Sequence, residues 1–168
     1  LTVVAMAAMP WLVLALAGGF AGDERFALAV DYGRIAFPYI LFISLAALLS
    51  GVLNATGRFA AAAAAPVLLN VIFIAALLAA GALGWPVGDT LAWAVPVAGI
   101  AQLALVWQAA ARAGFRLVPS RPRLSPEMRR LAVIAGPAML AGGVVQVNLI
   151  IGRQVASFFD GAVAWLSY

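Results

Sequence analysis

Long, uninterrupted apolar stretches decide what this sequence can fold into. Five of them run through residues 1–17, 34–53, 59–83, 90–111 and 131–151, and a sixth begins near residue 155. A helix needs about 20 apolar residues to cross the roughly 30 Å hydrocarbon core of a bilayer. Because these residues are continuous and do not alternate with polar ones, they fit helices and not barrel strands. The sequence therefore predicts an all-α, multi-pass transmembrane helix bundle.

The composition excludes several classes of protein. Hydrophobic residues make up 66% of the chain and charged residues 10%, whereas soluble domains are about 45–50% apolar and about 25% charged. A water-soluble globular domain is excluded on this ground. The net charge of +4 comes from a single loop, so it does not indicate nucleic-acid binding. The chain lacks Cys and His, which removes thiolate and imidazole catalysis and the usual zinc sites, so we expect no enzyme, metal or cofactor.

The charges between the apolar stretches predict the orientation in the membrane. Asp23 and Glu24 lie in the first connection, Arg58 in the second, Asp89 in the third and a group of arginines in the fourth. Positively charged loops of membrane proteins stay in the cytoplasm. The second and fourth connections are therefore predicted to be cytoplasmic, with the first and third outside.

The fourth connection is strongly basic. Its arginines are Arg112, Arg116, Arg121, Arg123, Arg129 and Arg130. The favoured interpretation is that they anchor the topology and attract anionic lipid. The alternative is that they capture a phosphate-bearing substrate. Ser125, Pro126 and Glu127 have the pattern of a helix start, so a helix is predicted to begin there and to continue into the fifth stretch.

Prolines lie in or near every complete apolar stretch. They are Pro10, Pro38, Pro66, Pro96 and Pro137. Proline leaves a helix carbonyl without its partner and bends the axis, so a bent bundle is expected. Bent helices suit alternating access, but prolines are also generally frequent in membrane helices, and the sequence leaves both interpretations open.

A few polar side chains interrupt the apolar stretches. Asn70 and Gln102 are predicted mainly to support neighbouring helices, because amides commonly bond between membrane helices. Gln146, Asn148 and Arg153 lie in the outer half of the fifth stretch and are expected to face a wet interior. Arg153 has the alternative of reaching the outer headgroups. Together with Asn70, these three residues are the candidates for a substrate pathway.

Two segments closely resemble the MurJ (MviN) family of lipid II flippases. They are RIAFPYILFISLAALLSGVLNATGRFAAAAAAPVLLN, residues 34–70, and GPAMLAGGVVQVNLIIGRQVASFFDGAVAWLSY, residues 136–168. The resemblance covers essentially the whole chain, including Ala8-Met9-Pro10-Trp11 and Leu91-Ala92-Trp93-Ala94-Val95. The ordered set of motifs is more specific than any single tripeptide.

The resemblance implies a protein of the multidrug/oligosaccharidyl-lipid/polysaccharide exporter superfamily, with fourteen helices in two lobes around a cationic cavity. This chain then corresponds to an internal piece, from the third helix to the start of the eighth. Residues 1–113 would end the N-terminal lobe with four helices, residues 114–130 would form the cytoplasmic loop between lobes, and residues 131–168 would start the C-terminal lobe. The family arginines held to bind pyrophosphate lie mainly in helices outside this piece. Where Gly152-Arg153 stands here, relatives carry a small polar pair, so the family gives Arg153 no substrate role.

The function that the resemblance implies is movement of lipid II from the inner to the outer leaflet of the bacterial cytoplasmic membrane. Lipid II is undecaprenyl-pyrophosphate-linked disaccharide-pentapeptide, and its transport serves peptidoglycan and cell wall biogenesis. Membrane lipids are expected partners, and the cell-wall synthesis machinery is a further candidate. Two alternatives are another exporter of the same superfamily, for multidrug or polysaccharide-lipid substrates, and a membrane scaffold that recruits cell-wall enzymes.

Overall fold

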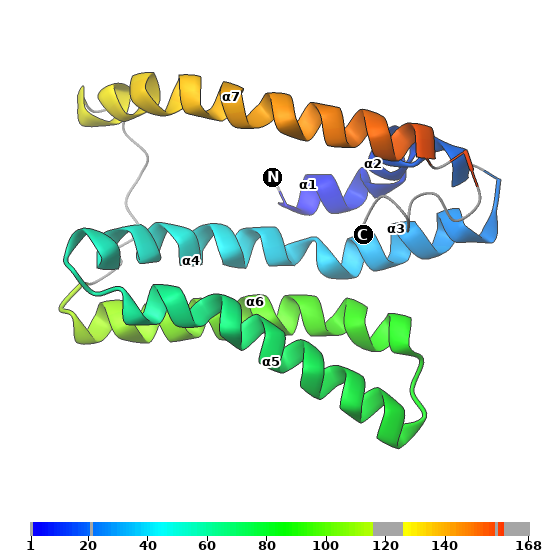
Figure 1. Cartoon of the computed structure of the whole chain (residues 1–168), viewed down its shortest axis with the longest axis horizontal. Coiled ribbons are helices and arrows are strands. Elements are labelled where there is room, and N and C mark those ends of the chain that lie inside the picture. The colour runs from blue at the N-terminus through cyan, green and yellow to red at the C-terminus, as the bar shows by residue number, and fades with distance from the viewer. Residues whose placement is uncertain (1, 21, 116–125, 157, 160–168) are drawn as a thin grey trace. The chain divides into compact units, whose positions relative to one another are not determined.

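The described part of the chain is helical. The computed structural model describes residues 2–20, 22–115, 126–156 and 158–159, and within these ranges it contains no strand. Its elements are α1 (Thr2–Ala7), α2 (Met9–Leu16), the 3₁₀ helix η1 (Gly18–Phe20), α3 (Glu24–Ala36), α4 (Pro38–Ala55), α5 (Ala60–Leu83), α6 (Val87–Arg112) and α7 (Pro126–Ala156) (Figure 1). The predicted all-α class is confirmed.

Four helical segments in the described residues are long and apolar enough to cross a membrane. They are Glu24–Ala55, which combines α3 and α4, then Ala60–Leu83, Val87–Arg112 and Met128–Ala156. They correspond to the second to fifth predicted stretches. The first of these segments starts before the predicted start at residue 34. The charged residues Asp31 and Arg34 are exposed and lie within the regular helix α3, so they do not mark a helix boundary. The predicted sixth stretch falls mainly on residues 160–168, which lie outside the described residues.

The first apolar stretch does not form the one continuous helix that the sequence predicts. It divides at Ala8 into α1 and α2, and neither is long enough to cross a membrane alone. The physical reason is Pro10, which has no amide hydrogen to give to the Met6 carbonyl four residues earlier. Instead, the Nε of Arg34 donates to the Met6 carbonyl oxygen over 3.4 Å. A side chain from α3 thus replaces the missing backbone donor.

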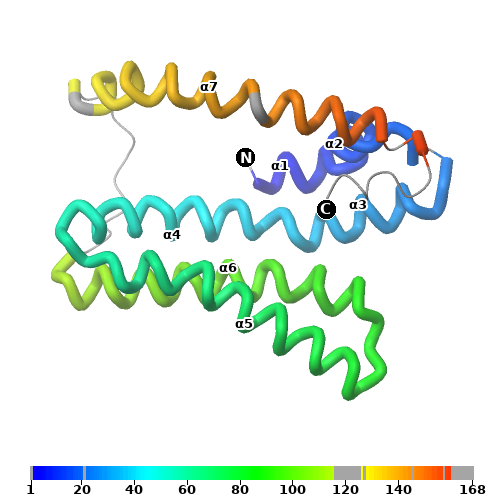
Figure 2. The backbone as a smooth tube through the Cα atoms, viewed as in Figure 1, coloured from blue at the N-terminus to red at the C-terminus, as the bar shows by residue number. Residues whose placement is uncertain are grey.

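The other prolines lie where the helices are expected to bend. Pro38 is the first residue of α4, at the joint with α3. Pro66, Pro96 and Pro137 lie inside α5, α6 and α7. Figure 2 shows that α5 diverges from α6 toward the loop at Gly84. Such divergence leaves part of each helix free to face lipid.

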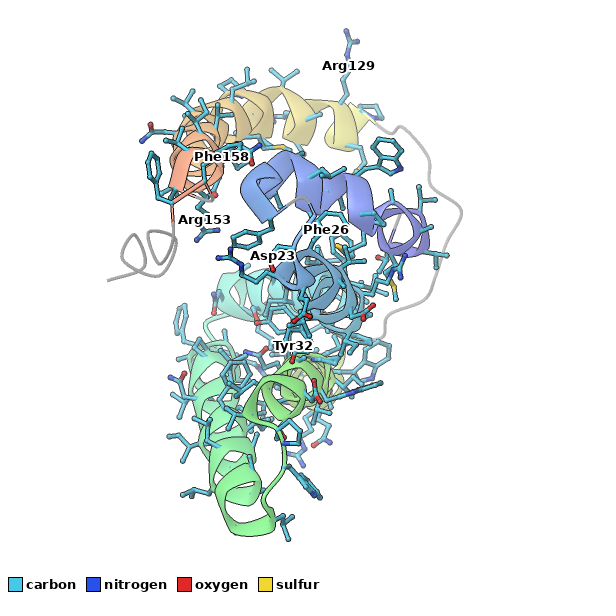
Figure 3. The ribbon with its side chains drawn as sticks, turned by 90° about the vertical axis from the view of Figure 1, so that its right-hand side faces the viewer. Asp23, Phe26, Tyr32, Arg129, Arg153 and Phe158 are labelled. Atoms are coloured by element: carbon cyan, nitrogen blue, oxygen red, sulfur yellow. The ribbon has the colours of Figure 1, made fainter. Side chains whose placement is uncertain are left out.

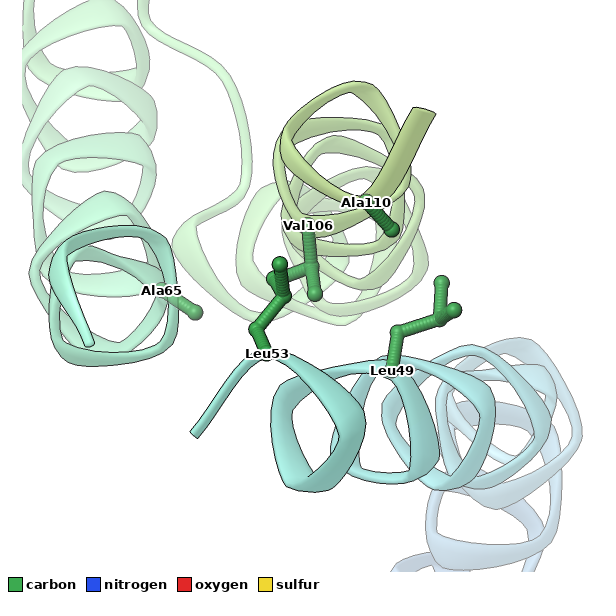
Figure 4. Close-up of a cluster of buried hydrophobic side chains, with 5 residues drawn as sticks. All are labelled: Leu49, Leu53, Ala65, Val106 and Ala110. Carbon is green, nitrogen blue, oxygen red and sulfur yellow. The ribbon is translucent and has the colours of Figure 1, made fainter. Parts of the chain in front are cut away.

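The chain separates into two compact units. The first comprises Leu1–Met9 and Ala27–Leu117, and the second comprises Pro10–Phe26 and Val118–Tyr168. The core of the first unit is a small cluster in which α4, α5 and α6 meet: Leu49, Leu53, Ala65, Val106 and Ala110 (Figure 4). Lipid tails are as apolar as leucine, so burial from lipid provides little driving force and close packing of small residues must hold these helices together.

A glycine lies at the contact between α4 and α6. A Cβ atom on Gly99 of α6 would lie 2.8 Å from the Cδ2 atom of Tyr39 and 3.1 Å from the Cβ of Phe42, both on α4. Real Cβ atoms essentially never come as close as the first of these distances. The contact between α4 and α6 therefore depends on the absence of a side chain at Gly99.

In the second unit, α7 begins at Pro126, as the sequence predicts. Proline suits the first turn of a helix because its amide would be unpaired there anyway. The helix then continues to Ala156 through the predicted fifth stretch, and its end contacts η1. This contact places the side chain of Gln154, near the end of α7, beside the end of α2.

Candidate functional site

Gln102 is the buried polar side chain of the first unit. Its residue is 2% exposed, and its Nε2 donates a hydrogen bond to the Ala65 carbonyl oxygen of α5 over 2.8 Å. The predicted role of Gln102, a bond between neighbouring membrane helices, is confirmed. The acceptor directly precedes Pro66, so the bond joins α6 to α5 at the point where proline interrupts the α5 hydrogen-bond ladder.

The Gln102 bond serves orientation more than stability. Interhelical hydrogen bonds in membrane proteins contribute on average about 0.6 kcal/mol. The Oε1 of Gln102 is buried with no hydrogen-bond partner, and an unsatisfied buried acceptor costs about 1–3 kcal/mol. The net contribution is therefore close to zero or unfavourable. What the bond does supply is a fixed register between α5 and α6.

The polar candidates on α7 do not all share one face. Gln146, Asn148 and Arg153 are all exposed on this helix. At about 100° per residue, Gln146 and Arg153 lie within about 20° of each other around the axis, whereas Asn148 is turned by about 160° from Gln146. The helix thus brings two of the three predicted residues together. The fourth candidate, Asn70, is exposed on α5 in the other unit.

Gln154 is a polar residue that the sequence analysis did not select. Its Oε1 accepts a hydrogen bond from the Gly18 backbone amide over 2.8 Å. Its Nε2 donates to the Leu14 carbonyl oxygen over 3.4 Å. One side chain of α7 thus caps both a free carbonyl at the end of α2 and a free amide of η1. The Gly18-Gly19 pair signals that a helix ends here and leaves unpaired backbone groups, but it does not reveal which side chain satisfies them.

The acidic turn after η1 is held by a local ion pair. The Nε of Arg25 donates to Oδ2 of Asp23, and the Arg25 guanidinium lies 5.2 Å from the centre of the Phe20 ring. The side-chain hydrogen bond from Arg25 lowers the pKa of Asp23 below its usual value. Both side chains are exposed, so the pair contributes little to stability. Asp23 and Glu24 are both exposed.

Three arginines of the basic connection are described. Arg112 is in the last turn of α6, where its charge complements the helix dipole. Arg129 and Arg130 lie at the start of α7, where positive charge opposes the dipole, and both are exposed. Figure 3 shows Arg129 near the start of this helix. The helix dipole therefore does not account for two arginines at this end of α7. Arg116, Arg121 and Arg123 lie outside the described residues.

Comparison with known proteins identifies the family. The family model described as "Lipid II flippase MurJ" matches residues 1–168. The chain belongs to the MurJ family. It is 46% identical over its whole length to a "Probable lipid II flippase MurJ" of Rhizobium meliloti (strain 1021), of which it covers 32%. A MurJ protein of Rhizobium tropici with the same description is 43% identical over the whole chain, which covers 32% of it.

A further MurJ relative comes from Burkholderia. The "Lipid II flippase MurJ" of Burkholderia cenocepacia is 43% identical over the whole chain, which covers 34% of that protein. The chain therefore spans about a third of the length of the MurJ relatives that it matches. The resemblance seen in the sequence is confirmed, and with the four apolar helices it identifies a multi-pass membrane protein.

Proposed function

We propose that this chain is the central membrane-embedded part of a flippase that moves lipid II from the inner to the outer leaflet of the bacterial cytoplasmic membrane. The observation that carries the proposal is the match of the MurJ family model across residues 1–168. The protein is a transporter and not an enzyme, because no covalent bond of its substrate changes. The comparisons favour neither a multidrug or polysaccharide-lipid exporter nor a membrane scaffold.

Moving the polar headgroup of lipid II across the membrane requires a protein cavity and helices that can bend. The pyrophosphate and sugars of lipid II cannot cross hydrocarbon unaided, because transfer of charged and polar groups into an apolar medium is very costly. The polyprenyl tail is apolar and stays in lipid. A wet, positively charged cavity that opens alternately to each side carries the headgroup. The proline-interrupted helices α5, α6 and α7 supply segments that bend during such a change.

The parts of the chain take different roles in this scheme. Residues 1–113 end one lobe, residues 131–168 start the other, and residues 114–130 form the connection on the cytoplasmic side. The exposed arginines of this connection contact anionic lipid and fix the orientation. Gln146 and Arg153, which share a face of α7, are the polar pair best arranged to line a wet interior from one side. Association with cell-wall synthesis enzymes is a further proposed property.

Depletion of the full-length protein that carries this chain tests the function. Its loss is expected to leave lipid II on the cytoplasmic side, because the headgroup has no other low-cost route across hydrocarbon. The measurement is the fraction of radiolabelled lipid II in spheroplasts that an externally added lipid II-cleaving enzyme can reach, before and after depletion. We expect this fraction to fall at least fivefold while total lipid II does not decrease.

Two additions make the depletion experiment decisive. Re-expression of the wild-type protein should restore accessibility, which excludes damage unrelated to its loss. A decrease in total lipid II would indicate blocked synthesis, so the total is measured in the same cells. Unchanged external accessibility after complete depletion contradicts the proposal.

A further inference from the structure

A groove lies beside the first turns of α6. Its volume is about 350 Å³, and it is lined by Trp85, Pro86, Asp89, Thr90 and Trp93. Because α6 is long and apolar enough to cross a membrane, its first turns lie at the level of the lipid headgroups. The groove therefore combines two indole rings with a carboxylate at the membrane surface.

Asp89 is an isolated negative charge. It is the single charged residue in residues 59–111, it is exposed, and among the described residues it forms no ion pair. The Thr90 hydroxyl does not compensate for it, because that hydroxyl already donates to the Pro86 carbonyl oxygen over 2.9 Å. A carboxylate in this position attracts a cation that is present at the surface of the membrane.

Tyr32 of α3 lies beside the first turn of α6. Its hydroxyl is near enough to the Asp89 carboxylate to interact with it. A Cβ atom on the neighbouring Gly88 would lie 2.5 Å from the Tyr32 hydroxyl, so the tyrosine reaches the start of α6 beside a residue without a side chain. Figure 3 shows Tyr32 on α3. The Asp89 carboxylate is exposed and has lone pairs to offer a ligand.

The two indoles flank Asp89 at equal distances in the sequence. Trp93 lies four residues after Asp89 within α6, a spacing that places these two side chains along one side of the helix. Trp85 lies four residues before Asp89, in the turn that precedes the start of α6 at Val87, and lines the same groove. The exposed fractions of Trp85 and Trp93 are 54% and 62%. Indole rings favour the membrane interface, and their faces attract ammonium groups.

We propose that this groove binds the ammonium headgroup of a zwitterionic phospholipid, with phosphatidylethanolamine as the fitting ligand. The Asp89 carboxylate pairs with the ammonium, and Trp85 and Trp93 face it from either side. A lipid is the occupant because the same region of the chain exposes Leu83, Val87 and Val97, against which acyl chains pack. An anionic phospholipid is disfavoured, since its charge has the same sign as Asp89.

The test measures lipid preference of the purified full-length protein. It is titrated with phosphatidylethanolamine and with phosphatidylglycerol of identical acyl chains, and lipid-bound species are counted by native mass spectrometry. We expect the wild-type protein to bind phosphatidylethanolamine about 5- to 10-fold more tightly, the size that a partly desolvated cation–π contact provides. Asp89→Asn and Trp93→Leu should each reduce this preference to within about twofold.

Controls separate lipid recognition from loss of structure. Trp107→Leu removes another exposed indole of α6, in a groove without a carboxylate, and should keep the full preference. Asp89→Glu retains the charge and should retain most of the preference, and unfolding temperatures verify that each variant is folded. Equal binding of the two lipids by the wild-type protein overturns the proposal, as does an undiminished preference in Asp89→Asn. Occupation of the groove by a basic side chain from elsewhere in the full-length protein would give the first of these results.

Discussion

Gly99→Val is expected to destabilise the folded protein by about 2–3 kcal/mol, the usual range for forcing extra atoms into a well-packed core. Valine places a Cβ atom where the ring of Tyr39 and the Cβ of Phe42 already lie, at 2.8 and 3.1 Å. The second neighbour is attached directly to the α4 backbone, so rotation of a flexible side chain does not relieve the contact. The helices α4 and α6 must move apart, which also disturbs the cluster around Leu53 and Val106.

The measurement is the unfolding temperature of the purified full-length protein in detergent. Gly81→Val is the matched control, because Gly81 also lies within a membrane-spanning helix but a Cβ there meets nothing within 4 Å. In both positions valine is a better helix former than glycine, so the intrinsic propensity term is shared. A Gly99→Val protein as stable as the control shows that α4 and α6 do not pack through this glycine.

Gln154→Leu is expected to cost about 1–2 kcal/mol, since it removes hydrogen bonds to two backbone groups at once. The Gly18 amide loses its acceptor and the Leu14 carbonyl loses its side-chain donor. The bond to the Gly18 amide is short and partly buried, whereas the bond to the Leu14 carbonyl oxygen is exposed and 3.4 Å long, so most of the cost comes from the first. Leucine has a similar size, so the change isolates the loss of hydrogen bonding.

Two measurements reveal the effect of Gln154→Leu. The unfolding temperature should fall, and amide hydrogen exchange at Gly18 should accelerate by at least tenfold. Gln108→Leu is the control, because this glutamine is exposed near the end of α6. If exchange at Gly18 is unchanged in Gln154→Leu, the side chain does not cap the end of α2.

The positions of most helices follow from the sequence because they depend on local properties. Length and continuous apolarity predict the helices that became α4 to α7, and the Pro126 start of α7 follows from the preference of proline for a first helical turn. Gln102 was predictable as a supporting residue because a lone amide among alanine and leucine has few other favourable partners in a membrane helix. Its acceptor, Ala65, is 37 residues away and follows only from the packing of α5 against α6.

Hydrogen bonds between residues far apart in the chain could not be predicted from the sequence. The break at Ala8 follows from Pro10, but it is tolerated because Arg34, 28 residues after Met6, supplies a donor. Gln154 reaches Gly18 across 136 residues, so periodicity within one helix gives no hint of it. The candidate pathway on α7 was recognised by residue type, whereas helix geometry separates Asn148 from Gln146 and Arg153. This separation follows from the spacing of the residues along a helix, unlike the partner of Gln154.

Site-directed labelling tests most directly whether these apolar helices cross the membrane with the arginine-rich connection in the cytosol. Single cysteines are introduced as Ser120→Cys, Thr56→Cys and Glu24→Cys into a full-length protein without other cysteines, and intact spheroplasts are treated with a membrane-impermeant maleimide. Glu24→Cys should be labelled, and the other two should react only after the membrane is permeabilised. Labelling of Ser120→Cys in sealed spheroplasts would contradict the proposed orientation and the transport direction built on it.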